Sequence, residues 1–169
     1  MVVSAATGHN RAVQAAGGPV SELSAAGPAP VSVIRHGPLC LRLRLRLPAL
    51  QSLLNEHSFW AAGRRHIDLA AMLRGSAAVV SAWQAGRLVG FGRATSDGVY
   101  RAVLWDVVVA EPLQGQGLGR RIVEELLASP AVARAERVYL MTTNSDGFYR
   151  KLGFDEKHGQ KLLVRPGAP

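Results

Sequence analysis

The stretch from residue 104 to residue 121 limits most strongly what this chain can fold into. It reads LWDVVVAEPLQGQGLGRR, an apolar run with one embedded acid followed by a turn that contains Gly115, Gly117 and Gly119. After the turn, apolar residues recur at helical spacing, at Leu118, Ile122, Val123, Leu126 and Leu127. The pattern predicts a buried strand that passes through a glycine turn directly into a helix. This arrangement aims backbone N–H groups at a bound phosphate.

The charges in the first turn of that helix favour a bound anion. Arg120 and Arg121 have the wrong sign for the positive end of a helix dipole. Pairs with Glu124 and Glu125, four residues further on, would offset part of the penalty. A bound anion would remove the conflict, but a tight turn with two solvated arginines is an equally good interpretation.

The glycine spacing excludes two common phosphate-binding loops. A Walker A loop requires a lysine that is missing here, and a Rossmann fingerprint requires a glycine where Arg120 stands. The residues instead fit Gln-x-x-Gly-x-Gly, from Gln114 through Gly117 to Gly119. On this motif the chain resembles the GCN5-related N-acetyltransferase (GNAT) family, whose acyl-CoA pyrophosphate loop has this pattern between its fourth strand and third helix.

Length and composition predict one domain with an extension. Residues 1–30 are mostly Ala, Gly, Pro and Ser, so we expect them to be disordered and to precede a single domain over residues 31–169. Cys40 is the only cysteine, which fits a reducing compartment and argues against a zinc site. No apolar run reaches the roughly 18–20 residues of a membrane span. We therefore expect a bacterial cytoplasmic protein, with cyanobacteria included, rather than a plastid one.

The net charge of +8 is compatible with nucleic acid, an anionic surface or a phosphorylated cofactor. The basic residues do not alternate with aromatic ones, which argues against specific nucleic-acid binding. Residues 39–47 read LCLRLRLRL, with leucines on one face and Arg42, Arg44 and Arg46 on the other, and this period of two predicts a half-buried strand. Its arginine face would be solvated or would bind an acidic partner.

The remaining periodicity predicts a mixture of helices and strands. We expect helices at about 48–57 and 65–73, a hairpin of strands at 77–84 and 87–95, and the central strand at about 101–109. Beyond the helix that follows the glycine turn we expect a strand at 137–142, a short helix at 146–152, and a β pair at 154–156 and 161–164. The order β-α-α-β-β-β-α-β-α-β-β predicts an α+β fold with a mixed central sheet and helices on both faces.

A second motif supports the resemblance to the GNAT family. Residues 144–154 read NSDGFYRKLGF, and members carry a segment ending in F-Y-x-x-x-G-F at this place. The order of elements also matches, and the likeness covers roughly residues 31–165. Residues 90–98 and the W-D-V triplet at 105–107 are similar to the plastid and cyanobacterial branch that includes serotonin N-acetyltransferases. Plastid members are also associated with acetylation of protein lysines and N-termini.

The resemblance implies an acetyl-CoA site without a metal. Backbone groups of Val107 and Val109 would pair with the pantetheine arm, and Asn144 would contact the cofactor near its thiol end. Val107 N–H would also donate to the oxygen that gains charge during transfer. The pyrophosphate would lie at the turn and the first helical residues, which are Gln114, Gln116, Gly117, Leu118, Gly119 and Arg120.

Two residues are candidates for proton transfer. Tyr149 corresponds to the family's usual general acid, although a packing role for this ring is the alternative. Some members carry a glutamate where Val103 stands, so Asp106 is the nearest acid for a general base. Enclosure would raise the pKa of Asp106 toward neutrality. Alternatively, Asp106 is held by backbone donors without a catalytic role.

Three aromatic residues are candidates for an acceptor site, since Trp105, Phe59 and Trp60 would form a wall for an indole amine or simply pack in the core. His57 and His66 lie near the same connection, where a surface or packing role is expected.

The sequence therefore predicts an acetyl-CoA-dependent N-acetyltransferase of a small arylalkylamine. A protein amine is the alternative acceptor, and a non-catalytic acyl-CoA sensor is the alternative of another class. Dimers are frequent among members, and the Leu/Arg strand would be one candidate homodimer interface.

Overall fold

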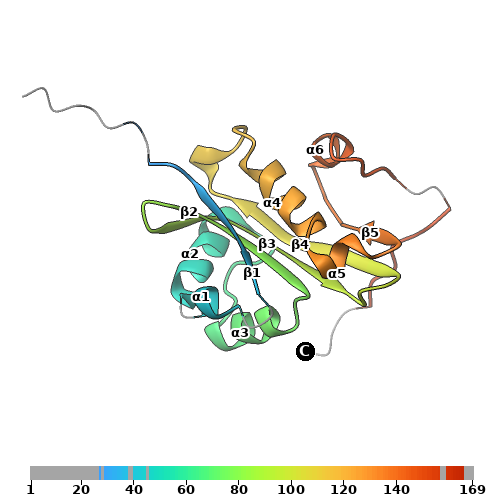
Figure 1. Ribbon diagram of the computed structural model, residues 1–169, viewed down its shortest axis with the longest axis horizontal. Helices are drawn as coiled ribbons and strands as arrows, with labels where there is room; N and C mark the ends of the chain where they lie inside the picture. Colours follow the sequence, from blue (N-terminus) through green and yellow to red (C-terminus); the bar gives the residue numbers. More distant parts are fainter. Residues whose placement is uncertain (1–26, 28, 38–39, 45, 157–158, 166–169) are drawn as a thin grey trace, which may run out of the picture.

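A mixed five-stranded sheet forms the centre of the molecule, in the order β1-β2-β3-β4-β5 (Figure 1). The computed structural model describes residues 27, 29–37, 40–44, 46–156 and 159–165. The first four strands are antiparallel neighbours, and β4 pairs with β5 in parallel. The strands are β1 (Ser32–His36), β2 (Ala78–Gln84), β3 (Arg87–Ser96), β4 (Arg101–Val109) and β5 (Arg137–Tyr139). The extension expected over residues 1–30 lies almost entirely outside the described residues.

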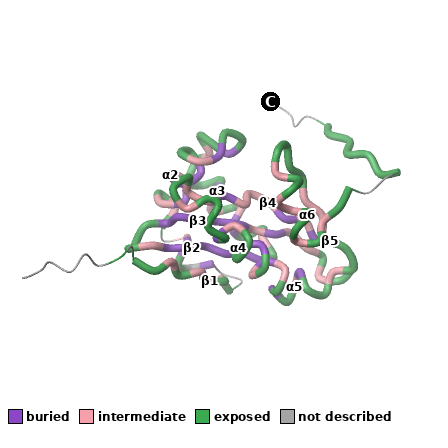
Figure 2. Tube along the Cα trace, turned by 90° about the horizontal axis from the view of Figure 1, so that it is seen from above, coloured by how far each residue is buried: buried purple, intermediate pink, exposed green. Residues whose placement is uncertain are grey.

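Helices cover both faces of the sheet. One face packs against α1 (Leu41–Arg44), α2 (Leu47–His57) and α3 (His66–Arg74), and the other against α4 (Leu118–Leu127) and α5 (Pro130–Ala133). A short 3₁₀ turn, η1 (Glu111–Leu113), leads from β4 to the glycine turn, and α6 (Asp146–Arg150) follows β5. The central strands are the most buried elements (Figure 2). The α+β class with a mixed sheet is confirmed.

The strand predicted over residues 39–47 is wrong. Residues 41–44 form α1, and α2 begins at Leu47. Leu43, Leu47, Leu50 and Leu54 follow one another at spacings of three and four, and Leu43, Leu50 and Leu54 are fully buried. Leu and Arg also favour helices, whereas strands favour β-branched residues, which are missing from this run. The helical stripe therefore outweighs the local alternation, and no Leu/Arg strand exists there to serve as a dimer interface.

The end of the chain also differs from the prediction. β5 ends at Tyr139 rather than at residue 142, and no strand occurs among the described residues at 154–156 and 159–165. Leu162, Leu163 and Val164 are 69%, 87% and 78% exposed. A short apolar run has the composition of a strand, but a strand requires a pairing partner, and local sequence does not supply one.

Candidate active site

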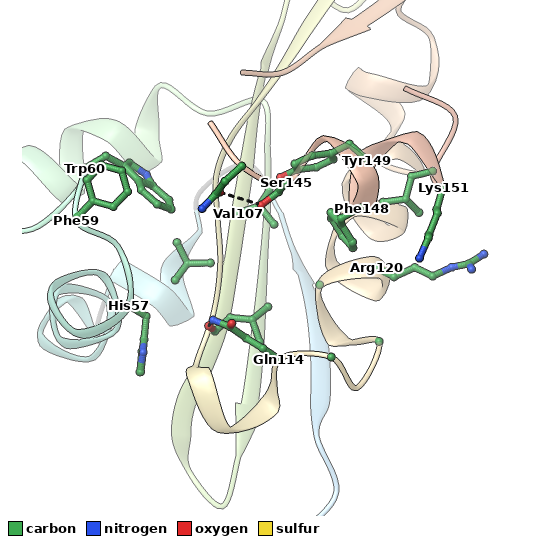
Figure 3. Close-up of a pocket in the computed structure, with 17 residues that line it drawn as sticks. His57, Phe59, Trp60, Val107, Gln114, Arg120, Ser145, Phe148, Tyr149 and Lys151 are labelled. Carbon is green, nitrogen blue, oxygen red and sulfur yellow. Dashed lines mark hydrogen bonds between the residues drawn. The ribbon is translucent and has the colours of Figure 1, made fainter. Parts of the chain in front are cut away.

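A cavity of about 680 Å³ opens between the end of β4, the glycine turn and α6. Phe59 and Trp60 lie on one side of β4, Tyr149 and Phe148 lie on the other, and Val107 stands between them (Figure 3). The lining residues are His57, Phe59, Trp60, Val107, Val108, Val109, Gln114, Gly115, Gly117, Gly119, Arg120, Asn144, Ser145, Phe148, Tyr149, Lys151 and Leu152.

The glycine turn forms one end of this cavity through its backbone conformation. Gly115 and Gly117 have φ angles of 73° and 82°, in the left-handed region that favours glycine. Two glutamine side chains hold the turn, because Gln114 Nε2 donates to the Val109 carbonyl at 2.9 Å and Gln116 Nε2 donates to the Pro112 carbonyl at 2.8 Å. This conformation brings the N-terminus of α4 to the cavity.

The N-terminus of α4 is suited to an anion. Gly117 is its N-cap without a capping side chain, and no acid lies in the first turn. The first backbone N–H groups of a helix lack intrahelical partners, and the dipole places partial positive charge there. Arg120 donates to Glu124 at 2.7 Å as the sequence predicts, but Glu125 accepts from Arg35 of β1 rather than from Arg121. Lys151 adds a further positive charge to the lining.

The middle of the cavity wall is the edge of β4 that faces β5. Parallel pairing of the two strands ends at Val103 and Tyr139. Past that point, β4 has no strand partner on this side among the described residues, although Val107 and Val109 line the cavity. An unpaired strand edge presents N–H and C=O groups to any extended ligand. The edge therefore leads from Val107 toward the glycine turn.

Tyr149 lies at the end of the cavity opposite the glycine turn (Figure 3). Its ring packs edge-on against Phe148 and Phe154, with centroids 4.8 and 5.9 Å away. Burial raises the pKa of Tyr149 above its ordinary value, so the hydroxyl keeps its proton at neutral pH. A protonated phenol that lines a cavity is able to donate a proton there.

Asp106 is not placed as the sequence suggests. Its side chain is 5% exposed, accepts hydrogen bonds from Arg93 Nε at 2.7 Å and Arg64 Nη1 at 3.1 Å, and does not line the cavity. Burial by itself raises the pKa of Asp106, but the hydrogen bonds and charges of Arg64 and Arg93 outweigh it, and the pKa is lowered. The expected rise toward neutrality is therefore wrong, and the geometry argues against a proton acceptor here.

The three candidate aromatic residues separate into two groups. Phe59 and Trp60 line the cavity with their rings packed edge-to-face, 5.1 Å apart between centroids, and they are 81% and 51% exposed. Trp105 does not line the cavity, because its Nε1 donates to Thr95 Oγ1 at 2.9 Å and Arg93 lies over its ring. Of the three candidates, Phe59 and Trp60 thus line the cavity and Trp105 does not.

Most of the residues expected to contact acetyl-CoA line the cavity, namely Val107, Val109, Gln114, Gly117, Gly119, Arg120 and Asn144. Gln116 and Leu118 instead line a separate hollow of about 70 Å³ beside Arg121. Sequence reasoning missed Ser145, Phe148 and Lys151, and it gave His57 only a surface or packing role. Ser145, Phe148 and Lys151 lie inside the second motif, which was the available signal. His57 has no such signal, because α2 approaches the cavity only through tertiary packing.

Comparison with known proteins agrees with this architecture. The sequence model of the acetyltransferase (GNAT) family matches residues 45–154. The chain belongs to the GNAT family. A protein from Xanthomonas campestris pv. campestris, described as a member of the same family, superposes with a TM-score of 0.68 at 24% identity, covering 83% of this chain and 96% of the other. At that level of identity, the superposition establishes the fold.

Two curated relatives share the central part of the sequence. Serotonin N-acetyltransferase 2, chloroplastic, of Oryza sativa subsp. japonica is 48% identical over 71 residues, which cover 41% of this chain and 36% of the relative. The uncharacterized N-acetyltransferase ycf52 of Porphyra purpurea is 44% identical over 69 residues, which cover 40% of each protein. The chain thus spans about two fifths of the length of these relatives.

Neither a metal site nor a membrane span is found in the part of the chain that the structure describes. No group of three or more His, Cys, Asp or Glu side chains lies close enough there to hold a metal ion. Within the same residues, no helix has both the length and the apolar character needed to cross a membrane.

Proposed function

We propose that the protein is an acetyl-CoA-dependent N-acetyltransferase whose acceptor is a primary amine of the small arylalkylamine class, such as serotonin or tryptamine. One observation carries the proposal. One cavity is lined by the uncapped N-terminus of α4, the edge of β4 that lacks a strand partner, the protonated Tyr149, and the exposed pair Phe59 and Trp60. Membership of the GNAT family and partial identity to a serotonin N-acetyltransferase support it.

The residues present fit acetyl-CoA, which supplies an acetyl group activated as a thioester. The backbone N–H groups from Gln116 to Arg120 bind the pyrophosphate, because the α4 N-terminus has neither an acid nor a side-chain cap to satisfy them. The edge of β4 at Val107 and Val109 pairs with the amides of the pantetheine arm. Asn144 contacts the cofactor near its thiol end.

Transfer then depends on two groups at the thioester end of the cavity. Val107 N–H donates to the thioester oxygen as negative charge develops on it. The neutral amine of the acceptor attacks the carbonyl carbon, and the bond to sulfur breaks. Tyr149 gives its proton to the departing thiolate, while the attacking nitrogen loses a proton to solvent, from which the tyrosinate is reprotonated. Phe59 and Trp60 bind the aromatic part of the acceptor and orient its amine.

A protein lysine or N-terminal amine is the second candidate acceptor. Phe59 is 81% exposed beside the cavity, and such an open wall also admits a peptide.

A homodimer and a bacterial cytoplasmic location stay predictions for this chain.

The test is release of free thiol from acetyl-CoA by the purified full chain, across a panel of serotonin, tryptamine, a polyamine and peptides with a free lysine or N-terminus. Turnover confined to the arylalkylamines supports the proposal, and turnover with peptides alone moves the acceptor to proteins. Binding of acetyl-CoA without turnover on any acceptor contradicts an enzymatic role with these amines and favours an acyl-CoA sensor.

A further inference from the structure

The backbone of β4 is irregular at Asp106. This residue has a φ of 51°, which non-glycine residues rarely adopt. The pairing of β3 with β4 shifts at the same place, because Phe91 pairs with Val108 while Arg93 pairs with Trp105. Asp106 and Val107 together therefore lie opposite the single residue between Phe91 and Arg93, which is the geometry of a β-bulge.

This bulge determines which residues of β4 face the cavity. Before it, Ala102 and Leu104 belong to the core on the α4 side of the sheet, whereas after it Val107 and Val109 pack toward that side. Side chains alternate along a strand, so an insertion of one residue exchanges the two faces. Val107 is also the first residue of β4 in the cavity lining. The position of Val107 thus depends on the bulge.

Two arginines from different parts of the chain converge on the bulge residue. Asp106 Oδ2 accepts from Arg93 Nε of β3 at 2.7 Å and from Arg64 Nη1 of the α2–α3 connection at 3.1 Å. We call these three residues the Asp106 cluster. Its carboxylate is 5% exposed and Arg93 is 15% exposed, so water screens the pair of Asp106 with Arg93 weakly, whereas Arg64 is 32% exposed. Uncommon φ angles persist where the surroundings fix them, and the cluster provides such surroundings.

Arg64 also connects the bulge to the aromatic wall. The same connection carries Phe59 and Trp60, and it is fastened to α2 where Gln51 Nε2 donates to the Arg64 carbonyl at 2.8 Å. Arg64 Nη1 further contacts Met72 Sδ of α3 at 3.5 Å. A change at Arg64 would therefore be transmitted both to the bulge and to the segment that lines the acceptor side of the cavity.

We infer that Asp106 is a positioning residue, whose ion pairs with Arg93 and Arg64 fix the β4 bulge so that Val107 N–H faces the reacting carbonyl and the Phe59–Trp60 segment stays in register with it. This inference rests on the proposed acetyl transfer. Asp106 then acts on the reaction through the backbone that it holds in place, and does not contact the substrate. It also distinguishes Arg64 from Arg65, which pairs with Asp68 at the surface.

The main test compares Asp106→Asn with Arg64→Ala, and uses Arg65→Ala as the matched control. Asparagine keeps the size of the side chain and tolerates a positive φ, so the variant removes the charge while preserving the fold. We expect Asp106→Asn to lower kcat about 10- to 100-fold, because small displacements at the reacting atoms have effects of that size. Its Kd for acetyl-CoA should stay within about threefold, because the glycine turn is unchanged.

Arg64→Ala should lower kcat less and raise the KM for the acceptor, whereas Arg65→Ala should match the wild type in all constants. The acidic limb of the kcat/KM profile should keep its position in Asp106→Asn. An acidic limb that shifts or disappears would identify Asp106 as a proton acceptor and overturn the inference. Unchanged kcat in Asp106→Asn would overturn it as well, and so would equal effects of Arg64→Ala and Arg65→Ala.

Amide NMR separates a failure of this inference from a failure of the proposed function. If wild-type protein turns over no acceptor, the proposed acetyl transfer fails, but the bulge is still observable. In Asp106→Asn and in Arg64→Ala, the ¹H–¹⁵N signals of Val107 and of the Phe59–Trp60 segment should move together, while those of the glycine turn stay in place. Signals that move throughout the protein, or at neither segment, would contradict the inference.

Discussion

The two ends of the cavity are built in different ways. At the glycine turn, the chain approaches a ligand through backbone conformation, with Gly115 and Gly117 at positive φ and a helix N-terminus without a side-chain cap. At the bulge, a non-glycine residue holds a positive φ with a buried carboxylate and two arginines. The first end should therefore depend on the positive φ angles that glycine permits, and the second on a proton donor, a buried charge and the close packing opposite the bulge.

Tyr149→Phe should have the largest effect, and it acts at the bulge end alone. Without the hydroxyl, the leaving thiolate receives no proton from the protein, and kcat should fall by about 10²- to 10⁴-fold. The Kd for acetyl-CoA, measured by calorimetry, should hardly change because the glycine turn is intact. A tyrosine must be protonated to donate, so wild-type kcat should fall as pH rises through a pKa that burial places above the ordinary value of about 10.

Tyr139→Phe is the matched control for this variant. Tyr139 lies on β5, pairs with Val103 and is absent from the cavity lining, so its loss should leave kcat and its pH profile unchanged. Retention of wild-type kcat and of the same fall at high pH in Tyr149→Phe would limit that residue to packing against Phe148 and Phe154.

Gly92→Ala should disturb the bulge end through packing. Gly92 is the residue opposite the bulge, and an added Cβ would lie 2.8 Å from Ile122 Cγ2 and 3.0 Å from Leu126 Cδ1, both on α4. We expect a loss of about 1–3 kcal/mol in the free energy of unfolding, the usual range for overpacking. Gly147→Ala serves as the control in urea denaturation, since no atom lies within 4 Å of its added Cβ. Equal stability of the two variants would show that α4 adjusts freely.

Gly117→Ala should affect the other end. At a φ of 82° an alanine costs about 1–2 kcal/mol of stability. Gly98, in the β3–β4 turn, has a φ of 77° and also has no atom within 4 Å of an added Cβ, so Gly98→Ala should be destabilised similarly. Only Gly117→Ala should also weaken acetyl-CoA binding, because it alone displaces the N-terminus of α4. Equal Kd values for both variants would remove the turn from the binding site.

The difference between the two ends also explains what the sequence predicts. The glycine turn is a local device, so the spacing of Gln114, Gly117 and Gly119 was enough to locate it, and β4 was bounded correctly at 101–109. The Asp106 cluster joins residues 13 and 42 positions apart. No local pattern pairs these residues. The predicted rise in the pKa of Asp106 therefore included the effect of burial but not the opposing effect of Arg64 and Arg93.

The same reasoning applies to the Leu/Arg run and to the aromatic residues. The alternation over residues 39–47 is a local pattern, whereas the stripe of buried leucines that decides the structure continues to Leu54 in α2. Trp105 and Trp60 are the same residue type, and only tertiary packing distinguishes them. Trp105 donates a hydrogen bond to Thr95, whereas Trp60 lines the cavity. Residue type suggested the site, and tertiary contacts selected its members.

Arg120→Ala should have the smallest effect and tests whether side-chain charge adds to the glycine turn. Arg120 lines the cavity and pairs with Glu124 across one turn of α4, an exposed pair worth about 0.3–0.5 kcal/mol, so the free energy of unfolding should change little. Acetyl-CoA affinity should fall about two- to fivefold at low salt, as expected for one exposed charge near an anion. Arg87→Ala, on the β2–β3 hairpin, is the control. Because a screening length near 3 Å at 1 M salt suppresses exposed charges, the two variants should converge there. A loss that persists at high salt would mean that Arg120 binds the ligand by direct hydrogen bonds, and that the glycine-turn end also depends on a side chain.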